Sequence, residues 1–435
     1  MVLCYHPSMR RSVHDTAHDP RNRLAMSTDA PFRSDRRAFL QAGALAAGAA
    51  LTAPGVAQEA AAPRPPLPRR KLGRTGVEVT MLDQGTVRGP GYARLLRLGY
   101  GLGVRMFDTA RVYGTEPVLR QWFEQQPEVR KEIFLITKDT PKRPKDLIAQ
   151  LDRRLEALGT DYIDLFFIHG LGDDHSLDDA IGMVASKEAK ETFEAIRRSG
   201  KARFVGFSSH HKDRATMISA AAKAGYVDAI MLQYRPWLAP DSALNRALDE
   251  AHAAGIGLIS MKQIAGNVFG DRPTGDILQE VQERVPVLKE RNLTPFQGLL
   301  HAIWSDERIS ACCVSMRNTD QLRENCDAAR RFEPLKEADI RTLGEVSVAM
   351  GQTLCADCDG RCADAAGTQA ALGDLTRLLT YYEQHGDRSI ARAEYARLPE
   401  SARDWSGADL EAARAVCPAR LDFARLLPRV DRRLA

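Results

Sequence analysis

Short apolar runs that end in polar residues, separated by helical stretches, restrict the fold of this chain more than any other feature. Amphipathic segments lie between most of the runs, among them residues 144–158, which end before Gly159, and residues 275–291; each repeats apolar side chains at helical spacing. Runs with few alternating polar residues are typical of parallel strands covered by helices. Eight such units closing on themselves predict an α/β fold, a (β/α)8 TIM barrel of about 250 residues. The runs lie near residues 79–86, 103–108, 133–138, 162–169, 203–208, 228–233, 256–262 and 309–315.

An open, doubly wound parallel sheet is the main alternative to the barrel. That fold favours a Gly-rich turn of the G-x-G-x-x-G type after its first strand. Here the first run is followed by Gly-Thr-Val-Arg-Gly-Pro-Gly at residues 85–91, which lacks that order of glycines. The sequence therefore favours the closed barrel.

Four segments are expected along the 435 residues. We interpret 1–57 as a targeting segment and 58–69, rich in Pro and Ala, as a linker. Residues 70–336 hold the strand and helix units and are expected to form the barrel. After that point the pattern changes to Arg- and Ala-rich helical segments with several Cys, so 337–435 are predicted to be a small, mostly helical C-terminal domain.

The first segment resembles a twin-arginine export signal. Arg36 and Arg37 precede Phe-Leu-Gln, an Ala-rich apolar stretch follows at 42–53, and Gly-Val-Ala at 55–57 offers small residues for cleavage. The alternative is a chance Arg pair before an Ala-rich helix. The apolar stretch is short for a bilayer, so no stable membrane span is expected. We expect an exported, periplasmic or otherwise extracytoplasmic protein, and this pathway carries folded proteins that already hold a cofactor.

The distribution of charge argues against nucleic-acid binding. The formal net charge is +4, but residues 1–57 alone contain seven Arg and four Asp. The rest of the chain has 54 basic and 53 acidic side chains and no dense basic stripe. A nucleic-acid partner is therefore not expected.

Four ionisable residues stand at or just after the ends of three neighbouring runs: Asp108, Tyr113, Lys138 and His169. The chemistry of a barrel enzyme lies where its parallel strands end. A phenol can protonate a developing alkoxide, but with an unperturbed pKa of about 10 it is a poor acid at neutral pH. A nearby ammonium would favour the phenolate, a carboxylate would hold that ammonium, and an imidazole would orient the substrate oxygen.

The motifs around these residues resemble the aldo/keto reductase superfamily over roughly residues 69–330. They are Leu72-Gly-Arg-Thr-Gly76, Asp108-Thr-Ala-Arg-Val-Tyr-Gly114, Ile136-Thr-Lys138 and Leu165-Phe-Phe-Ile-His169. The resemblance implies a TIM barrel that uses NADPH, usually without a metal at the reaction centre. It also implies that Tyr113 is the proton donor and that the other three residues support it. Each residue taken alone has a structural explanation, such as a helix cap or a core histidine.

The resemblance extends to a predicted cofactor groove. For the nicotinamide, it implies Ser208 and Ser209, where the family has a Ser-Asn pair, together with Gln233; Met261 stands where an aromatic residue usually stacks, with a core position as the alternative. For the adenosine end, a helix start favours phosphate and a guanidinium suits a 2′-phosphate, which favours NADP. The residues at that end are Ser315, Arg317, Gln321, Glu324 and Asn325.

The C-terminal cysteines suggest a metal site. Cys355, Cys358 and Cys362 follow a C-x2-C-x3-C pattern, and Cys417 precedes a Pro. This arrangement resembles the ferredoxin-like tail of one aldo/keto reductase branch and implies a [4Fe–4S] cluster with four thiolate ligands. Free thiols or disulfides, and a zinc site, are the alternatives. The remaining cysteines of the expected mature chain, Cys312, Cys313 and Cys326, are interpreted as packing residues.

Together these features predict an exported, NADP-dependent aldo/keto reductase that transfers hydride to an aldehyde or ketone. Its partners would be a small-molecule carbonyl substrate and, if a cluster is present, an electron-transfer protein. A different class remains open: a nucleotide-binding or electron-transfer protein that keeps the barrel without turnover. The sequence does not identify the substrate.

Overall fold

The computed structural model describes residues 65–435, except 87, 90, 264–267, 271–273, 356–359 and 386–387. The predicted export signal and most of the predicted linker lie outside the described residues. Cys358, one of the four predicted cluster ligands, also lies outside them.

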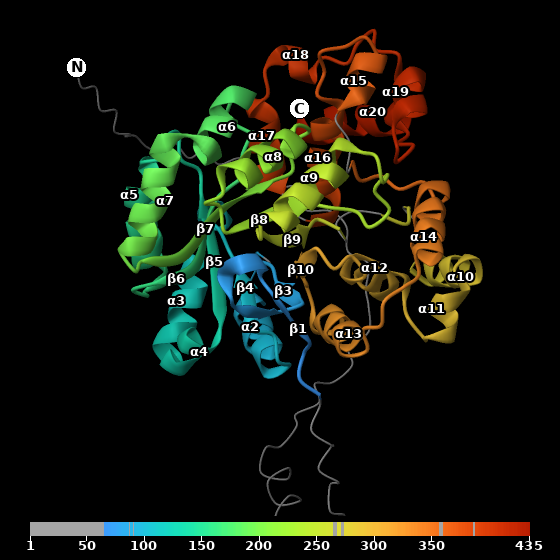
Figure 1. Ribbon diagram of the computed structural model, residues 1–435. Coiled ribbons are helices and arrows are strands. Elements are labelled where there is room, and N and C mark those ends of the chain that lie inside the picture. Colours follow the sequence, from blue (N-terminus) through green and yellow to red (C-terminus); the bar gives the residue numbers. More distant parts are fainter. Residues whose placement is uncertain are drawn as a thin grey trace, which may run out of the picture. The chain divides into compact units, whose positions relative to one another are not determined.

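Eight parallel strands form a closed barrel, which confirms the predicted fold class (Figure 1). Consecutive strands are neighbours from β3 to β10, and β10 pairs with β3 to close the ring. The open doubly wound sheet is therefore wrong. The strands are β3 (Leu82–Gln84), β4 (Met106–Asp108), β5 (Phe134–Asp139), β6 (Ile163–Ile168), β7 (Ala202–Ser209), β8 (Ala229–Gln233), β9 (Gly257–Met261) and β10 (Ile309–Val314).

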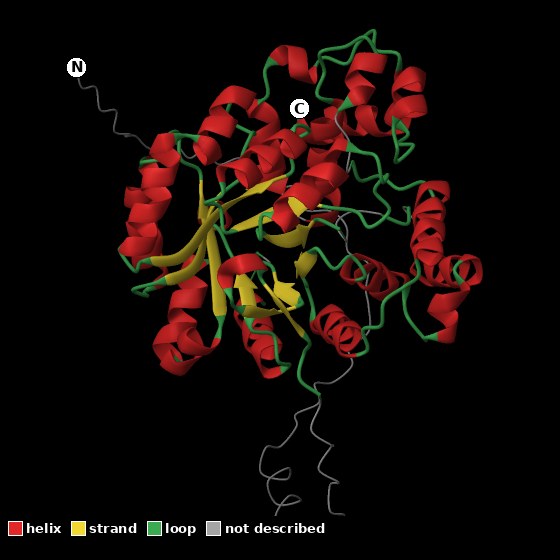
Figure 2. Cartoon of the chain, viewed as in Figure 1, coloured by secondary structure: helices red, strands yellow, loops and turns green. Residues whose placement is uncertain are grey.

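Helices surround the yellow strands in Figure 2 and follow most of them along the chain. The predicted helix at 144–158 is α5, which ends before Gly159 in the left-handed region. The helices of the barrel are α2 (Tyr92–Gly101), α3 (Glu116–Gln125), α4 (Pro127–Glu132), α5 (Asp146–Leu158), α6 (Leu177–Ala185), α7 (Lys187–Arg198), α8 (Arg214–Ala224), α9 (Ala243–Ala253), α10 (Thr274–Arg284), α11 (Pro286–Glu290), α12 (Pro295–Trp304) and α13 (Thr319–Arg330).

Two predicted elements are each divided in the structure. The run at 79–86 contributes the end of β2 (Glu78–Thr80), which pairs antiparallel with β1 (Arg69–Lys71), and then β3. The helical stretch at 275–291 is two helices, α10 and α11. Pro286 is the first residue of α11, where its missing N–H costs no hydrogen bond, whereas in a continuous helix it would remove one.

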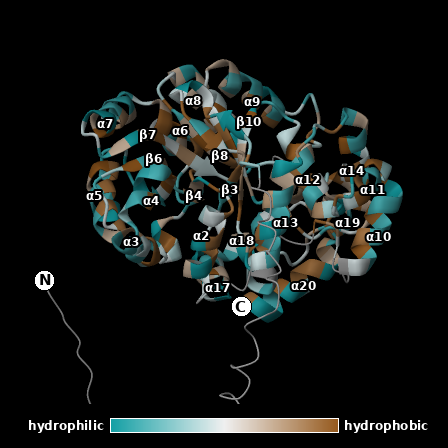
Figure 3. Ribbon diagram, turned by 90° about the horizontal axis from the view of Figure 1, so that it is seen from below, coloured by the Kyte–Doolittle hydropathy of each residue, from teal (hydrophilic) through white to brown (hydrophobic). Residues whose placement is uncertain are grey.

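Two apolar layers hold the barrel together. Side chains from one face of the strands fill the interior, where Leu72 and Val79, from the segment before β3, join them. Side chains from the other face pack against the helices in a larger core that includes Trp122 and Trp304. In Figure 3 the helices carry both brown hydrophobic and teal hydrophilic residues, as expected for helices that have one apolar face.

A helical region follows the barrel, and its first helix, over Glu337–Ala349, buries Leu343 and Val346 in the core of the barrel. Its C-terminal helices have an apolar cluster of their own, centred on Leu375, Leu421 and Phe423. In the part of the chain that the structure describes, no helix has both the length and the apolar character to cross a membrane. The helices are α14 (Glu337–Ala349), α15 (Arg361–Ala365), α16 (Leu372–Thr380), the π-helix η3 (Tyr381–His385), α17 (Arg388–Arg397), α18 (Glu400–Arg403), α19 (Leu410–Val416) and α20 (Phe423–Leu434).

Candidate active site

The four predicted catalytic residues lie at the carboxyl ends of three adjacent strands. Asp108 is the last residue of β4, Lys138 is the last but one residue of β5, and His169 follows β6 directly. The parallel register pairs Asp108 with Ile136 and Lys138 with Phe167, so the three strand ends are level at one rim. Tyr113 ends a short 3-10 helix, η2 (Arg111–Tyr113), after β4.

Asp108 and Lys138 form a buried ion pair. Their residues are 3% and 1% exposed, and the Lys138 ammonium donates hydrogen bonds to the Asp108 carboxylate and, at 3.0 Å, to the carbonyl oxygen of Thr109. Burial opposes a charge on Lys138, but the facing carboxylate raises the pKa of this lysine above its usual 10.5. Burial also raises the pKa of Asp108, and Lys138 opposes that shift.

Tyr113 and His169 form the half-buried part of the site. The Tyr113 hydroxyl lies 3.4 Å from Nε2 of His169, and the two rings meet edge to face with centroids 5.5 Å apart. The Lys138 Nζ lies 5.5 Å from the centroid of the phenol ring and donates to Asp108 and Thr109 instead of the phenol oxygen. The phenol, imidazole, ammonium and carboxylate thus meet at one rim, with histidine as the direct partner of the phenol.

Loss of solvent is the largest influence on the pKa of Tyr113 and on that of His169. It raises the pKa of Tyr113 above its usual 10, while Lys138 acts to lower it. The ammonium therefore works in the direction expected from the sequence, but it does not overcome desolvation. Burial, and then the charge of Lys138, hold the pKa of His169 well below 6.5. At neutral pH the pair is a neutral phenol beside a neutral imidazole.

Asp83 is a buried acid next to this site that the sequence analysis did not identify. It is fully buried in β3, and both carboxylate oxygens are without a hydrogen-bond partner among the described residues. Ligand atoms of Asp83, Asp108 and Cys313 lie within 4.8 Å of one another. Burial, followed by repulsion from Asp108, raises the pKa of Asp83 well above 3.8. An acidic residue in the middle of the apolar run at 79–86 was the available signal.

Replacing Asp83 by Asn is expected to change how stability depends on pH. The folded protein keeps a proton on Asp83 that the unfolded chain releases above about pH 4, so the wild type loses unfolding free energy as pH rises from there to the folded pKa. Asn has no such proton. Relative to the wild type, the free energy of unfolding of the variant should therefore increase by about 1.4 kcal/mol per pH unit within that interval. Urea unfolding at pH 5, 6 and 7 measures this difference; parallel pH dependences would contradict it.

The predicted nicotinamide contacts lie at the ends of the next three strands. Ser208 and Ser209 end β7, Gln233 ends β8, and the half-buried Met261 ends β9. The Ser208 hydroxyl accepts a hydrogen bond from the N–H of Gly170 at 3.2 Å, and Ser209 donates to the carbonyl of Leu171 at 2.8 Å. Both serines therefore fix the loop that begins at His169. Their contact with a nicotinamide stays a prediction.

The predicted adenosine contacts divide into two groups. Ser315 and Arg317 are exposed after β10, and the N–H of Arg317 donates to Oε1 of Gln321 at 2.9 Å. On α13, the Glu324 carboxylate accepts a hydrogen bond from the Thr294 hydroxyl. Asn325 is buried. The first group lies at the solvent-exposed start of α13, which is capped by Asn318, and suits a phosphate.

Three of the four tail cysteines lie in the apolar cluster of the C-terminal region. Cys362 and Cys417 are 5% and 7% exposed, and Cys355 packs against the same cluster. Among the described residues, the thiols of Cys355, Cys362 and Cys417 do not gather within 4.8 Å of one another, so their role as metal ligands stays a prediction. Cys312 and Cys326 are buried packing residues of the main core, as predicted, whereas Cys313 belongs to the interior group with Asp83.

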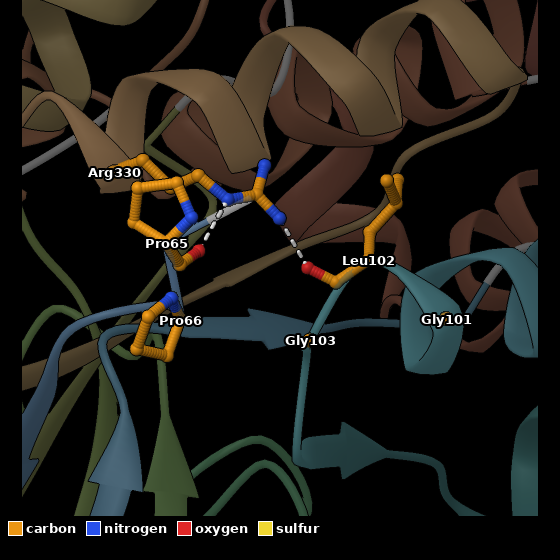
Figure 4. A pocket seen from close by; sticks show the side chains of 6 residues that line it. All are labelled: Pro65, Pro66, Gly101, Leu102, Gly103 and Arg330. Carbon is orange, nitrogen blue, oxygen red and sulfur yellow. Dashed lines mark hydrogen bonds between the residues drawn. The ribbon is translucent and has the colours of Figure 1, made fainter. Parts of the chain in front are cut away.

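A pocket at the other end of the barrel lies away from these residues. It is lined by Pro65, Pro66, Gly101, Leu102, Gly103 and Arg330 (Figure 4). The Arg330 guanidinium donates to the carbonyl oxygens of Pro65 and Leu102. Residues 101–103 come before β4, so this pocket is at the amino-terminal end of the strands. The active sites of such barrels lie at the opposite, carboxyl-terminal end.

The closed barrel and the ionisable residues at its carboxyl rim define an α/β barrel with a cluster of acid and base groups at the ends of its strands. A family model described as "Aldo/keto reductase family" matches residues 83–348, and the chain belongs to that family. It is an oxidoreductase of a family whose members depend on NAD(P)H.

Two relatives are similar to this chain over most of their own length. The chain is 26% identical to L-galactose dehydrogenase of Arabidopsis thaliana over 306 residues, which cover 65% of this chain and 93% of that protein. It is 23% identical to L-glyceraldehyde 3-phosphate reductase of Escherichia coli, over 60% of this chain and 86% of that protein. A solved holo aldo-keto reductase from Bacillus halodurans shares the fold, with a TM-score of 0.51, 20% identity and coverage of 64% of this chain and 96% of that one.

Proposed function

We propose that the protein reduces an aldehyde or ketone with NADPH and that Tyr113 donates the proton. The observation that carries this proposal is the neutral phenol beside His169, with the Asp108–Lys138 pair on the adjacent strand ends. NADPH supplies the hydride. Tyr113 gives its proton to the developing alkoxide, His169 orients the carbonyl oxygen by a hydrogen bond, and Lys138 stabilises the phenolate that remains.

The residues at the neighbouring strand ends fit such a cofactor. Ser208, Gln233 and Met261 place a hydroxyl, an amide and a thioether at the ends of three neighbouring strands, which suits a carboxamide-bearing ring. The Gln233 amide donates to the carbonyl oxygen of Cys355 at 2.7 Å, and a bound carboxamide would take the place of that contact. Arg317 at the capped start of α13 suits a 2′-phosphate, and this supports NADP over NAD. Fluorescence titration with NADPH and NADH tests the preference.

The assay that tests the proposal is loss of NADPH absorbance with a panel of aldehydes and ketones. Steady consumption that depends on the carbonyl compound supports a reductase. Tight NADPH binding without consumption for any carbonyl compound would favour the alternative, a nucleotide-binding or electron-transfer protein that keeps the barrel.

The reduction rate is expected to be nearly independent of pH between about pH 6.5 and 10. The pKa of His169 lies below that interval, so the imidazole stays neutral throughout it. The pKa of Tyr113 lies above it, so the phenol keeps the proton that it must donate. Measuring kcat against pH with a neutral aldehyde checks this, and a marked loss between pH 7 and 9 would show a phenol with a lowered pKa.

The cysteine tail supports a [4Fe–4S] cluster as part of the same proposal. The thiols of Cys362 and Cys417 are buried in the apolar cluster of the C-terminal region, and Cys355 packs against it. Cysteine thiolates are ligands for both iron and zinc. A cluster would permit exchange of electrons with a partner protein. Visible absorbance together with iron and zinc analysis of the purified protein distinguishes a cluster, a zinc site and metal-free thiols.

We also propose that the protein is exported through the twin-arginine pathway. The support is the order of Arg36, Arg37, the apolar stretch and the small residues at 55–57. NADPH is not expected outside the cytoplasm, so the cofactor would travel bound. Mass spectrometry of the mature N-terminus in the native host tests the cleavage, and Arg36→Lys with Arg37→Lys should keep the protein in the cytoplasm.

A further inference from the structure

The C-terminal helical region contacts the same rim of the barrel that holds the catalytic residues. Gln233, at the end of β8, donates from Nε2 to the carbonyl oxygen of Cys355 at 2.7 Å. Lys262, the residue after β9, donates from its ammonium to the hydroxyl of Tyr381. In Figure 1, α16 and α17 carry the orange to red colours of the chain's end and lie beside this rim. The region therefore forms part of the surroundings of the site.

Lys262 has a strained backbone. Its φ of 59° falls in the left-handed region, which is costly for a residue with a long side chain. Such strain persists where the surrounding structure requires a particular side-chain direction, and it is common at ligand sites. Here the direction brings the ammonium to within 4.9 Å of the centre of the Tyr381 ring.

Tyr381 stands where α16 passes into the π-helix η3. π-Helical turns are rare in proteins, and those that occur are often found at functional sites. The guanidinium of Arg377, one turn earlier, lies 5.3 Å from the same ring. The ring thus contacts both a cation of the barrel and a cation of its own helix.

The charges of these two cations are compensated differently. Arg377 forms ion pairs with Asp374 at 2.8 Å and with Glu394 at 3.5 Å. Over the part of the chain that the structure describes, the ammonium of Lys262 has the Tyr381 hydroxyl as its partner and no carboxylate within ion-pair distance. Asp173, the acid nearest in the chain to His169, is engaged with His210 at 3.2 Å. Lys262 acts on the Asp173 carboxylate at longer range, because its charge helps to lower the pKa of that acid, and its ammonium forms no direct ion pair with a described carboxylate.

This charge lies close to the reacting groups. The positive charge of Lys262 contributes to lowering the pKa of His169, after burial and Lys138, and Tyr381 interacts electrostatically with Tyr113. A substrate whose carbonyl oxygen meets Tyr113 and His169 would extend toward Lys262.

We propose that Lys262 binds an anionic group, a carboxylate or phosphate, on the carbonyl substrate, and that Tyr381 of the C-terminal region holds the ammonium in place until the anion arrives. An ammonium paired with a phenol keeps a donor for a carboxylate or phosphate oxygen, and such charge-assisted hydrogen bonds are strong in a partly buried site. Lys262 is thereby a specificity residue, and the inference rests on the proposed carbonyl reduction.

The test compares an anionic and a neutral aldehyde of equal chain length, 4-oxobutanoate and butanal, with the full-length protein. Lys262→Gln should raise KM for 4-oxobutanoate by about tenfold or more and leave KM for butanal within about twofold. Tyr381→Phe keeps the ring and should leave the preference for 4-oxobutanoate intact or strengthen it. Lys212→Gln is the matched control, because Lys212 is 60% exposed, ion-paired with Asp213 at 3.3 Å and part of the neighbouring loop.

Other results would overturn the proposal. An equal rise in KM for both aldehydes in Lys262→Gln would give the lysine a structural role. Weaker NADPH binding with an unchanged preference for 4-oxobutanoate would assign it to the diphosphate of the cofactor.

Failure of the proposed function is separable from failure of this inference. If no variant consumes NADPH, calorimetric titration of the protein with succinate still tests the anion site. Binding to the wild type at least tenfold tighter than to Lys262→Gln would support it, and equal or absent binding would overturn it.

Discussion

Tyr113→Phe is expected to lower kcat for carbonyl reduction by about 10³-fold, within the range that general acid catalysis contributes. The variant keeps the aromatic ring that meets His169 edge to face and loses the hydroxyl that lies 3.4 Å from Nε2 of that histidine. Without this hydroxyl, the rim residues offer the alkoxide a neutral imidazole as the remaining hydrogen-bond donor. Steady-state kinetics with NADPH and a neutral aldehyde measure the loss.

The control for this variant is another tyrosine with a single hydrogen bond. The Tyr226 hydroxyl donates to the carbonyl of Ser186 at 3.0 Å, and Tyr226 precedes β8 at the opposite end of the barrel. Tyr226→Phe should cost about 1 kcal/mol of unfolding free energy and leave kcat unchanged. NADPH affinity should stay within about twofold in both variants. Retention of more than a tenth of the wild-type kcat in Tyr113→Phe would remove Tyr113 from the role of proton donor.

Lys138→Met is expected to lower the free energy of unfolding by about 3–5 kcal/mol, besides reducing activity. The substitution leaves the Asp108 carboxylate buried without its ammonium, in a site where Asp83 is a second acid nearby. Asp108→Asn combined with Lys138→Met removes both charges. The double variant should therefore recover part of the loss, and the two single effects should not add. Urea unfolding at pH 7 measures all three variants.

A surface ion pair provides the comparison. Lys201 and Asp152 approach to 2.6 Å, but their side chains are 45% and 50% exposed. Lys201→Met should cost about 0–1 kcal/mol, because solvent screens such a pair. If Lys138→Met costs no more than Lys201→Met, the buried pair does not stabilise the fold.

The fold and much of the rim followed from local patterns. Apolar runs at strand spacing, each ending in an ionisable residue, predicted that Asp108, Lys138 and His169 would meet. The prediction is correct because neighbouring parallel strands of a barrel end at the same rim. Residues at the ends of consecutive strands therefore lie close together. The interruption at Pro286 was less visible, since the apolar spacing continues across it.

The interior acid group required the closed ring. Asp83 and Cys313 are opposite each other because β10, the last strand of the barrel in the sequence, pairs with β3, the first. Which side chains of β3 face inward depends on this pairing: Leu82 faces the helices and Asp83 faces the interior. A single sequence carries no signal for a register between segments so far apart in the chain.

The sequence by itself determined the class of the protein, the order of its elements and the four ionisable residues that meet at the rim, because these depend on spacing within short segments. Only the tertiary structure decided that the phenol of Tyr113 bonds to His169 and not to Lys138, and that Tyr381 reaches Lys262 across the rim. Both contacts join segments that fold separately and meet only when the barrel and the C-terminal helices pack together, so their geometry is set by packing and not by local propensity.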